Sequence, residues 1–151
     1  MRSISPMEVD TNLRQKIFLI EKEMLKVPQV KLPLFHYFLP GLYLRELHIP
    51  AGATTTSKIH KHAFINFLTK GERSTLVDGK IERIRAPHFH ISPPGMKRIS
   101  YTHEDSIWIT AHFTSGTEIE NETNPDKLEK YLACDTEQEY LDFTRMISCQ
   151  L

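Results

Sequence analysis

Two histidines one residue apart, His60 and His62, are the residues of this sequence best suited to chemistry. They lie in the segment 59–68, which is expected to form a β-strand. Because successive side chains of a strand point to opposite faces, both imidazoles would share one face with Phe64 and Asn66. Such a pair can bind a metal, hydrogen-bond an organic ligand or serve a structural role. We expect it to form the floor of a site.

Histidines and a tryptophan on later expected strands could join this pair. His90 shares a strand face with His88, and Trp108 shares one with His112. If these faces meet the pair, His112 or His90 would add a third imidazole, and three imidazoles can hold zinc, nickel, copper or iron. Each of these histidines could instead be structural, and Trp108 could belong to the core.

The overall composition excludes several classes of protein. The 151 residues include 19 lysines and arginines and 19 aspartates and glutamates, so the basic excess of a nucleic-acid or polybasic membrane binder is missing. The sequence has neither an apolar run near the roughly 18 residues of a membrane span nor a signal-peptide pattern at its start. Cys134 and Cys149 have no disulfide or metal-motif spacing. We therefore expect a cytoplasmic protein that binds neither nucleic acid nor membrane.

The N-terminal part of the sequence predicts a helix followed by an extended arm. Residues 5–8 have the form of a helix capping box. An apolar stripe then recurs at helical spacing, and it consists of Leu13, Ile17, Ile20 and Met24. The segment 27–40 contains three prolines and is expected to cover apolar surface or to reach a second subunit.

The middle of the sequence predicts an all-β core, and the end predicts helices. Asp78-Gly79 is the strongest two-residue hairpin signal. The expected strands are 42–49, 59–68, 73–77, 80–85, 88–91, 97–101 and 106–113. Two short helices are expected afterwards, one capped at Asn124 and one starting from a capping box at 135–138. The chain thus divides into segments 1–40, 41–116 and 117–151, within a single domain.

Two segments of the expected core resemble the two motifs of the cupin superfamily. Residues 52–71, with His60-Lys61-His62, Asn66 and the expected turn at Lys70-Gly71-Glu72, resemble the first motif. Residues 93–98 resemble the second, whose family form is Pro-x-Gly-x-x-His. Runs that include 36–38, 49–52 and 108–112 are also similar to small cupin-like proteins of tailed bacteriophages. The resemblance implies an RmlC-like jelly-roll β-barrel, a homodimer or higher oligomer, with a pocket in the barrel mouth.

The sequence departs from the metal-binding form of the family at two positions. Asn66 stands where those members have Glu, and Arg98 stands where they have the final His. An inward-pointing Arg98 would weaken a metal and favour a carboxylate or phosphate. A one-residue shift of its strand would instead send Arg98 to solvent and Lys97 inward.

The hypothesis that accounts for these departures is a small-molecule-binding protein, not an enzyme, whose ligand is anionic or nucleotide-like. Its expected ligand-binding residues are Asn66, Arg98, Tyr101, Trp108 and His90. One alternative is a metal-dependent cupin enzyme, an oxygenase or isomerase, with a divalent metal (Zn, Ni, Fe or Cu) on His60, His62 and His112. A metal-free epimerase with a histidine base and Tyr101 as acid is a variant of it. A structural component of a phage virion is a third alternative.

Overall fold

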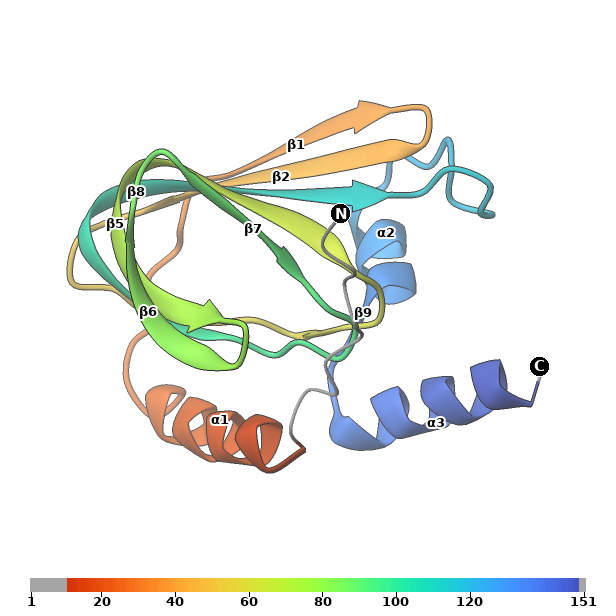
Figure 1. The fold of residues 1–151 in the computed structure, drawn as a ribbon, viewed down its shortest axis with the longest axis horizontal. Helices are drawn as coiled ribbons and strands as arrows, with labels where there is room; N and C mark the ends of the chain where they lie inside the picture. The colour runs from red at the N-terminus through yellow and green to blue at the C-terminus, as the bar shows by residue number, and fades with distance from the viewer. Residues whose placement is uncertain (1–10, 150–151) are drawn as a thin grey trace.

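The computed structural model describes residues 11–149 as a strongly curled antiparallel sheet with helices outside it (Figure 1). The helices are α1 (Thr11–Met24), α2 (Pro125–Leu132) and α3 (Glu137–Ser148). The strands are β1 (Leu34–Leu39), β2 (Leu42–Ile49), β3 (Thr54–Thr56), β4 (Ile59–His60), β5 (Phe64–Val77), β6 (Lys80–Arg85), β7 (His88–Ser92), β8 (Ile99–Phe113) and β9 (Ala133–Cys134). The predicted all-β jelly-roll core with helices at both ends is confirmed.

Two long strands, β5 and β8, hold the two halves of the sheet together. The main path runs β1-β2-β8-β5-β6, and β3 and β7 pair with β8 and β5. The first part of β5 pairs with β7 and its last part pairs with β6. In the same way, residues 99–101 of β8 pair with β3, and residues 106–113 pair with β2. Both strands therefore bend from one half of the barrel into the other, which encloses the space between the halves.

A glycine that was expected to end a strand instead bends one. Gly71 lies inside β5 with φ +89°, where a Cβ atom would come within 2.4 Å of the Asp105 carbonyl oxygen. The pairing of β5 with β8 shifts register on both sides of this point. This is the behaviour of a β-bulge, which bends a strand without ending it. Residues 99–101 of one expected strand and residues 106–113 of the next likewise belong to one strand, β8, which begins only at Ile99.

The predicted hairpin is confirmed, but the strand predicted over 59–68 is wrong. Asp78 and Gly79 both have positive φ, at 49° and 77°, as a two-residue hairpin turn requires. In contrast, β4 ends at His60 and pairs with β9, and β5 begins only at Phe64. The break at residues 61–63 ends the alternation on which the shared face of the two histidines depended.

The ends of the chain follow the predictions in part. Residues 34–39 of the expected arm form the edge strand β1, paired with β2. The predicted capping box at 5–8 lies outside the described residues. Asn124 caps α2 as predicted by accepting from the Asp126 amide, whereas Thr136, not Asp135, caps α3.

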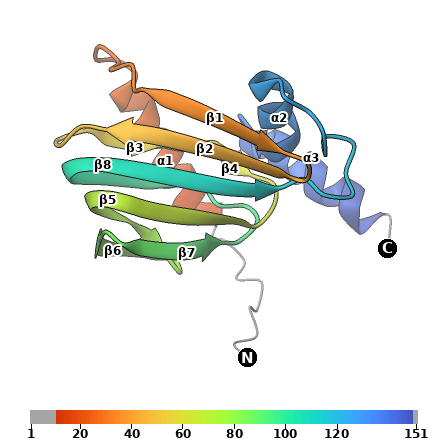
Figure 2. The ribbon, with the colours of Figure 1, turned by 90° about the horizontal axis from the view of Figure 1, so that it is seen from above.

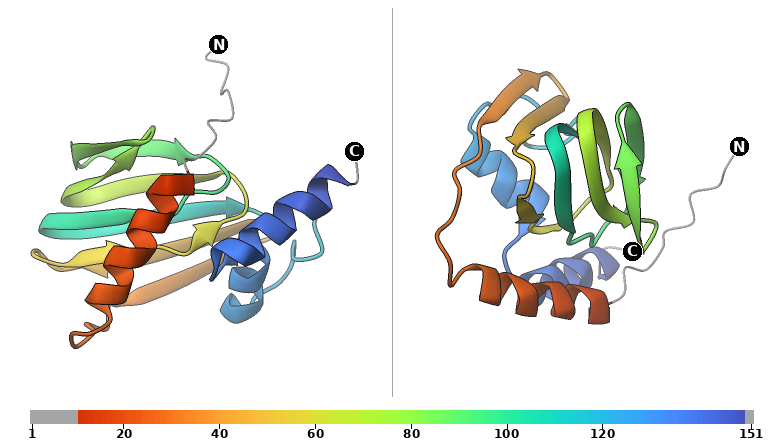
Figure 3. Two further views of the ribbon diagram at one scale, coloured as in Figure 1. Left: turned by 90° about the horizontal axis from the view of Figure 1, so that it is seen from below. Right: turned by 90° about the vertical axis from the view of Figure 1, so that its left-hand side faces the viewer.

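Helix α1 lies along the underside of the barrel, with α3 beside it (Figure 3). Its buried residues are Arg14 and Ile17, while Ile20 of the predicted stripe is 45% exposed. Arg14 forms a bidentate ion pair with Glu137 of α3, in which Nε donates to Oε2 at 2.8 Å and Nη2 donates to Oε1 at 2.6 Å. The predicted stripe is therefore covered in part, because Ile17 is buried and Leu13 and Met24 are half-buried, while Ile20 is exposed. No described helix is long and apolar enough to cross a membrane.

Candidate functional site: a cationic pocket in the barrel

A cavity of about 230 Å³ opens between the halves of the barrel, next to α2. Apolar side chains, among them Tyr43, Leu47, Phe64 and Leu132, form part of its wall. Trp108 of β8 also lines it and is 5% exposed. Arginine and histidine side chains form much of the rest of the lining. The pocket is therefore apolar along its sides and rich in nitrogen donors.

Arg98 points into the barrel, as one of the two sequence alternatives predicted. Its Nη1 donates to Asn66 Oδ1 at 2.9 Å, and its Nη2 donates to Ser92 Oγ. The side chain is buried, and its Nε has no hydrogen-bond partner. Lys97 points the other way and is buried as well, because α1 covers that side and Glu21 accepts from Lys97 Nζ at 3.0 Å.

A second buried arginine, Arg73, was missed by the sequence interpretation. Its Nε donates to Thr102 Oγ1 at 3.1 Å and its Nη2 to Thr55 Oγ1 at 2.7 Å. The guanidinium carbons of Arg73 and Arg98 lie 4.9 and 5.3 Å from the centroid of the Trp108 ring. The bulge at Gly71 shifts the alternation of side chains along β5. The inward direction of the Arg73 side chain could therefore not be predicted from residue spacing.

Both guanidinium groups lack an acidic partner among the described residues. Burial lowers the pKa of Arg73 to about 10. Burial, followed by repulsion from Arg73, lowers the pKa of Arg98 to about 9. Both groups remain cationic at neutral pH. The carboxylate in the pocket lining, Glu129, is ion-paired with Lys58 at 2.8 Å.

His60 and His112 form a stack at the wall of the pocket. Their rings are 5.7 Å apart between centroids and nearly parallel, at 10°. Burial is the main cause that lowers the pKa of His60 well below its usual value and that of His112 to about 3. His112 Nε2 lies 3.0 Å from Thr110 Oγ1, whereas the buried Nδ1 of His60 has no hydrogen-bond partner. Both imidazoles are thus neutral, and His60 keeps an unused polar atom.

The prediction that His62 shares this face is wrong. His62 does not line the pocket but packs against Tyr131 and Phe143 of the C-terminal helices, with ring centroids 5.6 Å apart in each case. The backbone turns between β4 and β5 at this point, so the two histidines diverge.

The other predicted ligand residues occupy three different positions. Asn66 is fully buried behind Arg98 and supports it without lining the cavity. His90 lies against Trp108, with ring centroids 5.7 Å apart, and burial followed by the Arg98 charge lowers its pKa to about 3. Tyr101 is 45% exposed, does not line the pocket and contacts His103. The pocket therefore contains Arg98, Trp108, His60 and His112 of the predicted set.

The sequence matches no protein-family model and no curated protein sequence. Among solved structures, the chain is similar to KdgF from a Halomonas species, with 18% identity, a TM-score of 0.48 and coverage of 56% of this chain and 82% of that one. It is also similar to an RmlC-like cupin from Shewanella frigidimarina, with 22% identity, a TM-score of 0.47 and coverage of 53% and 73%. A variant of the salicylate 1,2-dioxygenase from Pseudoaminobacter salicylatoxidans has 11% identity, a TM-score of 0.49 and coverage of 67% and 33%. Any functional assignment therefore has to rest on the side chains of this protein.

The predicted metal centre does not fit the side chains present. Among the described residues, no group of three or more His, Cys, Asp or Glu side chains is arranged to hold a metal ion. The His60 and His112 rings lie nearly parallel with their centroids 5.7 Å apart, and the third predicted ligand, His62, lies outside the pocket. Arg98 adds a buried positive charge close to the pair. Such a site suits an anion better than a divalent cation.

Proposed function

We propose that this protein is a cupin-type binding protein that holds a small organic anion in the barrel pocket. The observation that carries the proposal is the pair of buried guanidinium groups, Arg73 and Arg98, which lack a carboxylate partner among the described residues. An uncompensated buried charge costs several kcal/mol. A carboxylate or phosphate of a ligand would supply the missing negative charge and accept hydrogen bonds.

Two unused donors support the same assignment. The Nε atom of Arg98 and the Nδ1 atom of His60 are both buried and have no hydrogen-bond partner. Buried polar atoms normally have partners, because an unsatisfied one costs about 1–3 kcal/mol. The neutral His60 ring can donate from Nδ1 to an acceptor atom of a ligand.

The size and wall of the pocket favour a small acid with an apolar body. The cavity volume of about 230 Å³ is below the roughly 300–1,000 Å³ of pockets for drug-sized ligands. A nucleotide-like ligand, the other form of the sequence hypothesis, is therefore less favoured than a small carboxylate. The apolar part would lie against Tyr43, Phe64 and Leu132, with the carboxylate at the arginines.

The test is calorimetric titration of untagged protein with benzoate, acetate, inorganic phosphate and adenosine monophosphate. Benzoate is expected to bind best, because it combines a carboxylate with an apolar ring. Arg98→Met and Arg73→Met should each weaken binding at least about tenfold, which corresponds to about 1.4 kcal/mol. Arg145→Met is the matched control, because Arg145 is a surface residue of α3 with 73% of its side chain exposed.

Circular dichroism and urea unfolding of each variant separate lost binding from lost folding. Arg98→Lys, which retains a charge on a different donor, provides a milder second variant. If folded Arg98 and Arg73 variants bind every probe as well as the wild type does, the proposal is wrong. Binding of none of the probes by the wild type would favour the structural-component alternative.

A further inference from the structure

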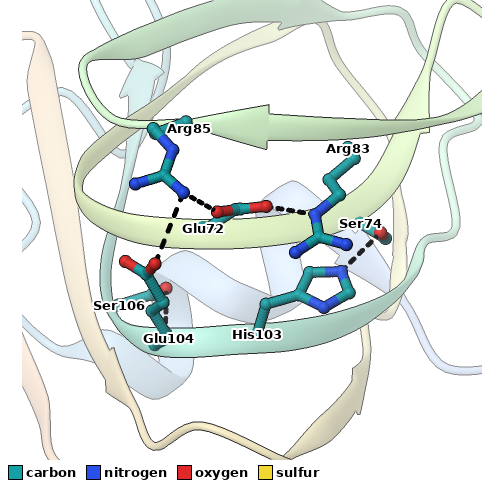
Figure 4. Close-up of polar contacts among 7 residues, drawn as sticks. All are labelled: Glu72, Ser74, Arg83, Arg85, His103, Glu104 and Ser106. Carbon is teal, nitrogen blue, oxygen red and sulfur yellow. Dashed lines mark hydrogen bonds and ion pairs between the residues drawn. The ribbon is translucent and has the colours of Figure 1, made fainter.

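The arginines of the described chain divide into two groups by their partners. Some pair with a carboxylate outside the pocket, and these are Arg14, Arg83, Arg85 and Arg145. At the surface, for example, Glu72 is held between Arg83 and Arg85 (Figure 4). Within residues 11–149, those without a carboxylate at ion-pair distance are Arg45, Arg73 and Arg98, and all of them line the pocket. The lack of acidic partners is thus a property of the pocket and not of the arginines in general.

Arg45 of β2 adds a further cation to the buried pair Arg73 and Arg98. It is partly exposed and lies beside Tyr43 and His112 in the pocket lining. Burial raises the pKa of the Tyr43 hydroxyl, and the charge of Arg45 opposes that rise. Burial, followed by the charge of Arg45, lowers the pKa of His112 to about 3. Arg45 therefore belongs to the end of the pocket that Tyr43 and His112 form.

Arg45 and Arg98 approach the pocket from different sides. In the sheet, β8 lies between β2 and β5 (Figure 2). Thr110 of β8 is in register with Arg45 of β2 on one side and with Asn66 of β5 on the other. Because neighbouring strands lie about 4.8 Å apart, the Cα atoms of Arg45 and Asn66 are separated by roughly 10 Å. The Arg98 guanidinium is hydrogen-bonded to Asn66, so one cation lies over β5 and the other comes from β2.

The charge of the pocket lining is strongly positive. The carboxylate in this lining, Glu129, is ion-paired with Lys58, and Lys58 also contacts Asp135 at 2.5 Å. The guanidinium groups of the pocket have no such partner, so a bound monocarboxylate would leave most of their charge uncompensated. Cations that are buried or half-buried gain from a counter-charge, because water does not solvate them fully. A ligand with two negative groups therefore matches this lining better than a ligand with one.

The surface between the two cationic sides is uncharged. The Phe64 ring contributes apolar area, and its centroid lies 5.9 Å from the guanidinium carbon of Arg98. The imidazoles of His60 and His112 are neutral, since burial is the main cause that lowers their pKa values. A ligand that reaches from Arg98 to Arg45 therefore needs an uncharged body between its two acidic groups.

We propose that the pocket selects a small dicarboxylate with an uncharged, apolar spacer. One carboxylate binds the buried pair Arg73 and Arg98, and the other binds Arg45 on the opposite side. This selectivity rests on the proposed function and narrows it, because a monocarboxylate leaves Arg45 without a counter-charge. Water reaches Arg45, so its share of the binding free energy is smaller than that of the buried pair.

Calorimetric titration at pH 7 with benzoate, isophthalate, terephthalate and the monoamide of isophthalate tests this selectivity. The carboxyl groups of all these probes are ionised at this pH. The monoamide has the shape of isophthalate but one negative charge fewer, so it separates the effect of charge from that of size. The better of the two diacids is expected to bind at least about tenfold more tightly than the monoamide. The monoamide should bind about as well as benzoate.

Substitutions of Arg45 identify the second carboxylate site. Arg45→Met should remove the preference for the diacid, so that diacid and monoamide affinities agree within about twofold. Arg45→Lys retains a charge and should keep part of the preference. Arg98→Met should instead weaken benzoate and the diacid alike. Arg145→Met, which removes an exposed cation from α3, is the matched control and should leave the preference unchanged. Circular dichroism of each variant confirms that it is folded.

The outcomes distinguish the dicarboxylate selectivity from anion binding itself. If benzoate binds and neither diacid binds more tightly than the monoamide, the selectivity is wrong while the proposed function stands. A preference that survives in folded Arg45→Met would also overturn it. If the wild type binds none of the acids, the proposed function and the selectivity fail together.

Discussion

The guanidinium group of Arg98 donates to the amide oxygen of Asn66 at a distance of 2.9 Å inside the barrel. These are the two positions at which residues 52–71 and 93–98 differ from the metal-binding form of the cupin motifs that they resemble. The departures are therefore coupled in space: a buried cation lies against a neutral amide. The pair leaves the positive charge of Arg98 available to a ligand.

Asn66→Asp is expected to weaken anion binding by supplying an internal carboxylate. The new side chain would form an ion pair with Arg98, so a ligand anion would lose its electrostatic advantage and bind at least about tenfold more weakly. Titration with benzoate measures the loss. Asn124→Asp adds the same charge at the exposed cap of α2 and should leave affinity unchanged. Unchanged affinity in Asn66→Asp would contradict the role of Arg98.

The affinity for a carboxylate is expected to fall as the pH rises through about 9. Burial and repulsion from Arg73 lower the pKa of Arg98 to about 9, so the guanidinium is cationic below that pH and loses charge above it. The pKa values of His90 and His112 are lowered to about 3, so these rings stay neutral at higher pH. Benzoate affinity should therefore be flat between about pH 5.5 and pH 8. An affinity that rises as the pH falls below 7 would instead assign the binding to a histidine.

The ion pair between Arg14 and Glu137 is expected to fasten α1 to α3. Their side chains are 4 and 21% exposed, and the pair spans 123 residues of sequence. A double-mutant cycle with Arg14→Met and Glu137→Gln should give a coupling free energy of about 1–3 kcal/mol in urea unfolding. The exposed pair Arg145 and Asp142, 3.9 Å apart, should give less than about 0.5 kcal/mol. Equal coupling in the two cycles would show that α1 is held in another way.

Gly95 is expected to tolerate alanine less well than Gly52. Both glycines have positive φ, at 83° and 87°, so alanine should cost about 1–2 kcal/mol of unfolding free energy at either position. At Gly95 the added Cβ would also lie 2.6 Å from the Tyr140 hydroxyl, whereas nothing lies within 4 Å at Gly52. The extra cost at Gly95 should be at least about 1 kcal/mol. In a Tyr140→Ala background this extra cost should fall, with Arg14 Nη1 at 3.3 Å as the remaining close atom. An unchanged extra cost would contradict the steric explanation.

The sequence alone determined the features that depend on neighbouring residues. The hairpin at Asp78-Gly79 and the cap at Asn124 are local, because a turn needs particular φ values and a cap needs one oxygen beside a free amide. The sequence of short strands with turn signals between them was also enough to predict the all-β core. These signals are carried by a few adjacent residues, so no tertiary information is needed to read them.

Only the tertiary structure decided which side chains meet in the pocket. A three-residue break separates His60 from β5 and sends His62 to the C-terminal helices, although the residue spacing favoured a shared face. The bulge at Gly71 brings Arg73 against Trp108 inside the barrel. Strict alternation from the residues of β5 before the bulge would have placed Arg73 on the outer face. Lys97 and Arg98 are both buried because α1 covers one face and the barrel encloses the other. Side-chain direction in a strand has a period of two, so a single break or bulge reverses every later assignment. Long-range packing decides where those interruptions fall, and it therefore decides the site.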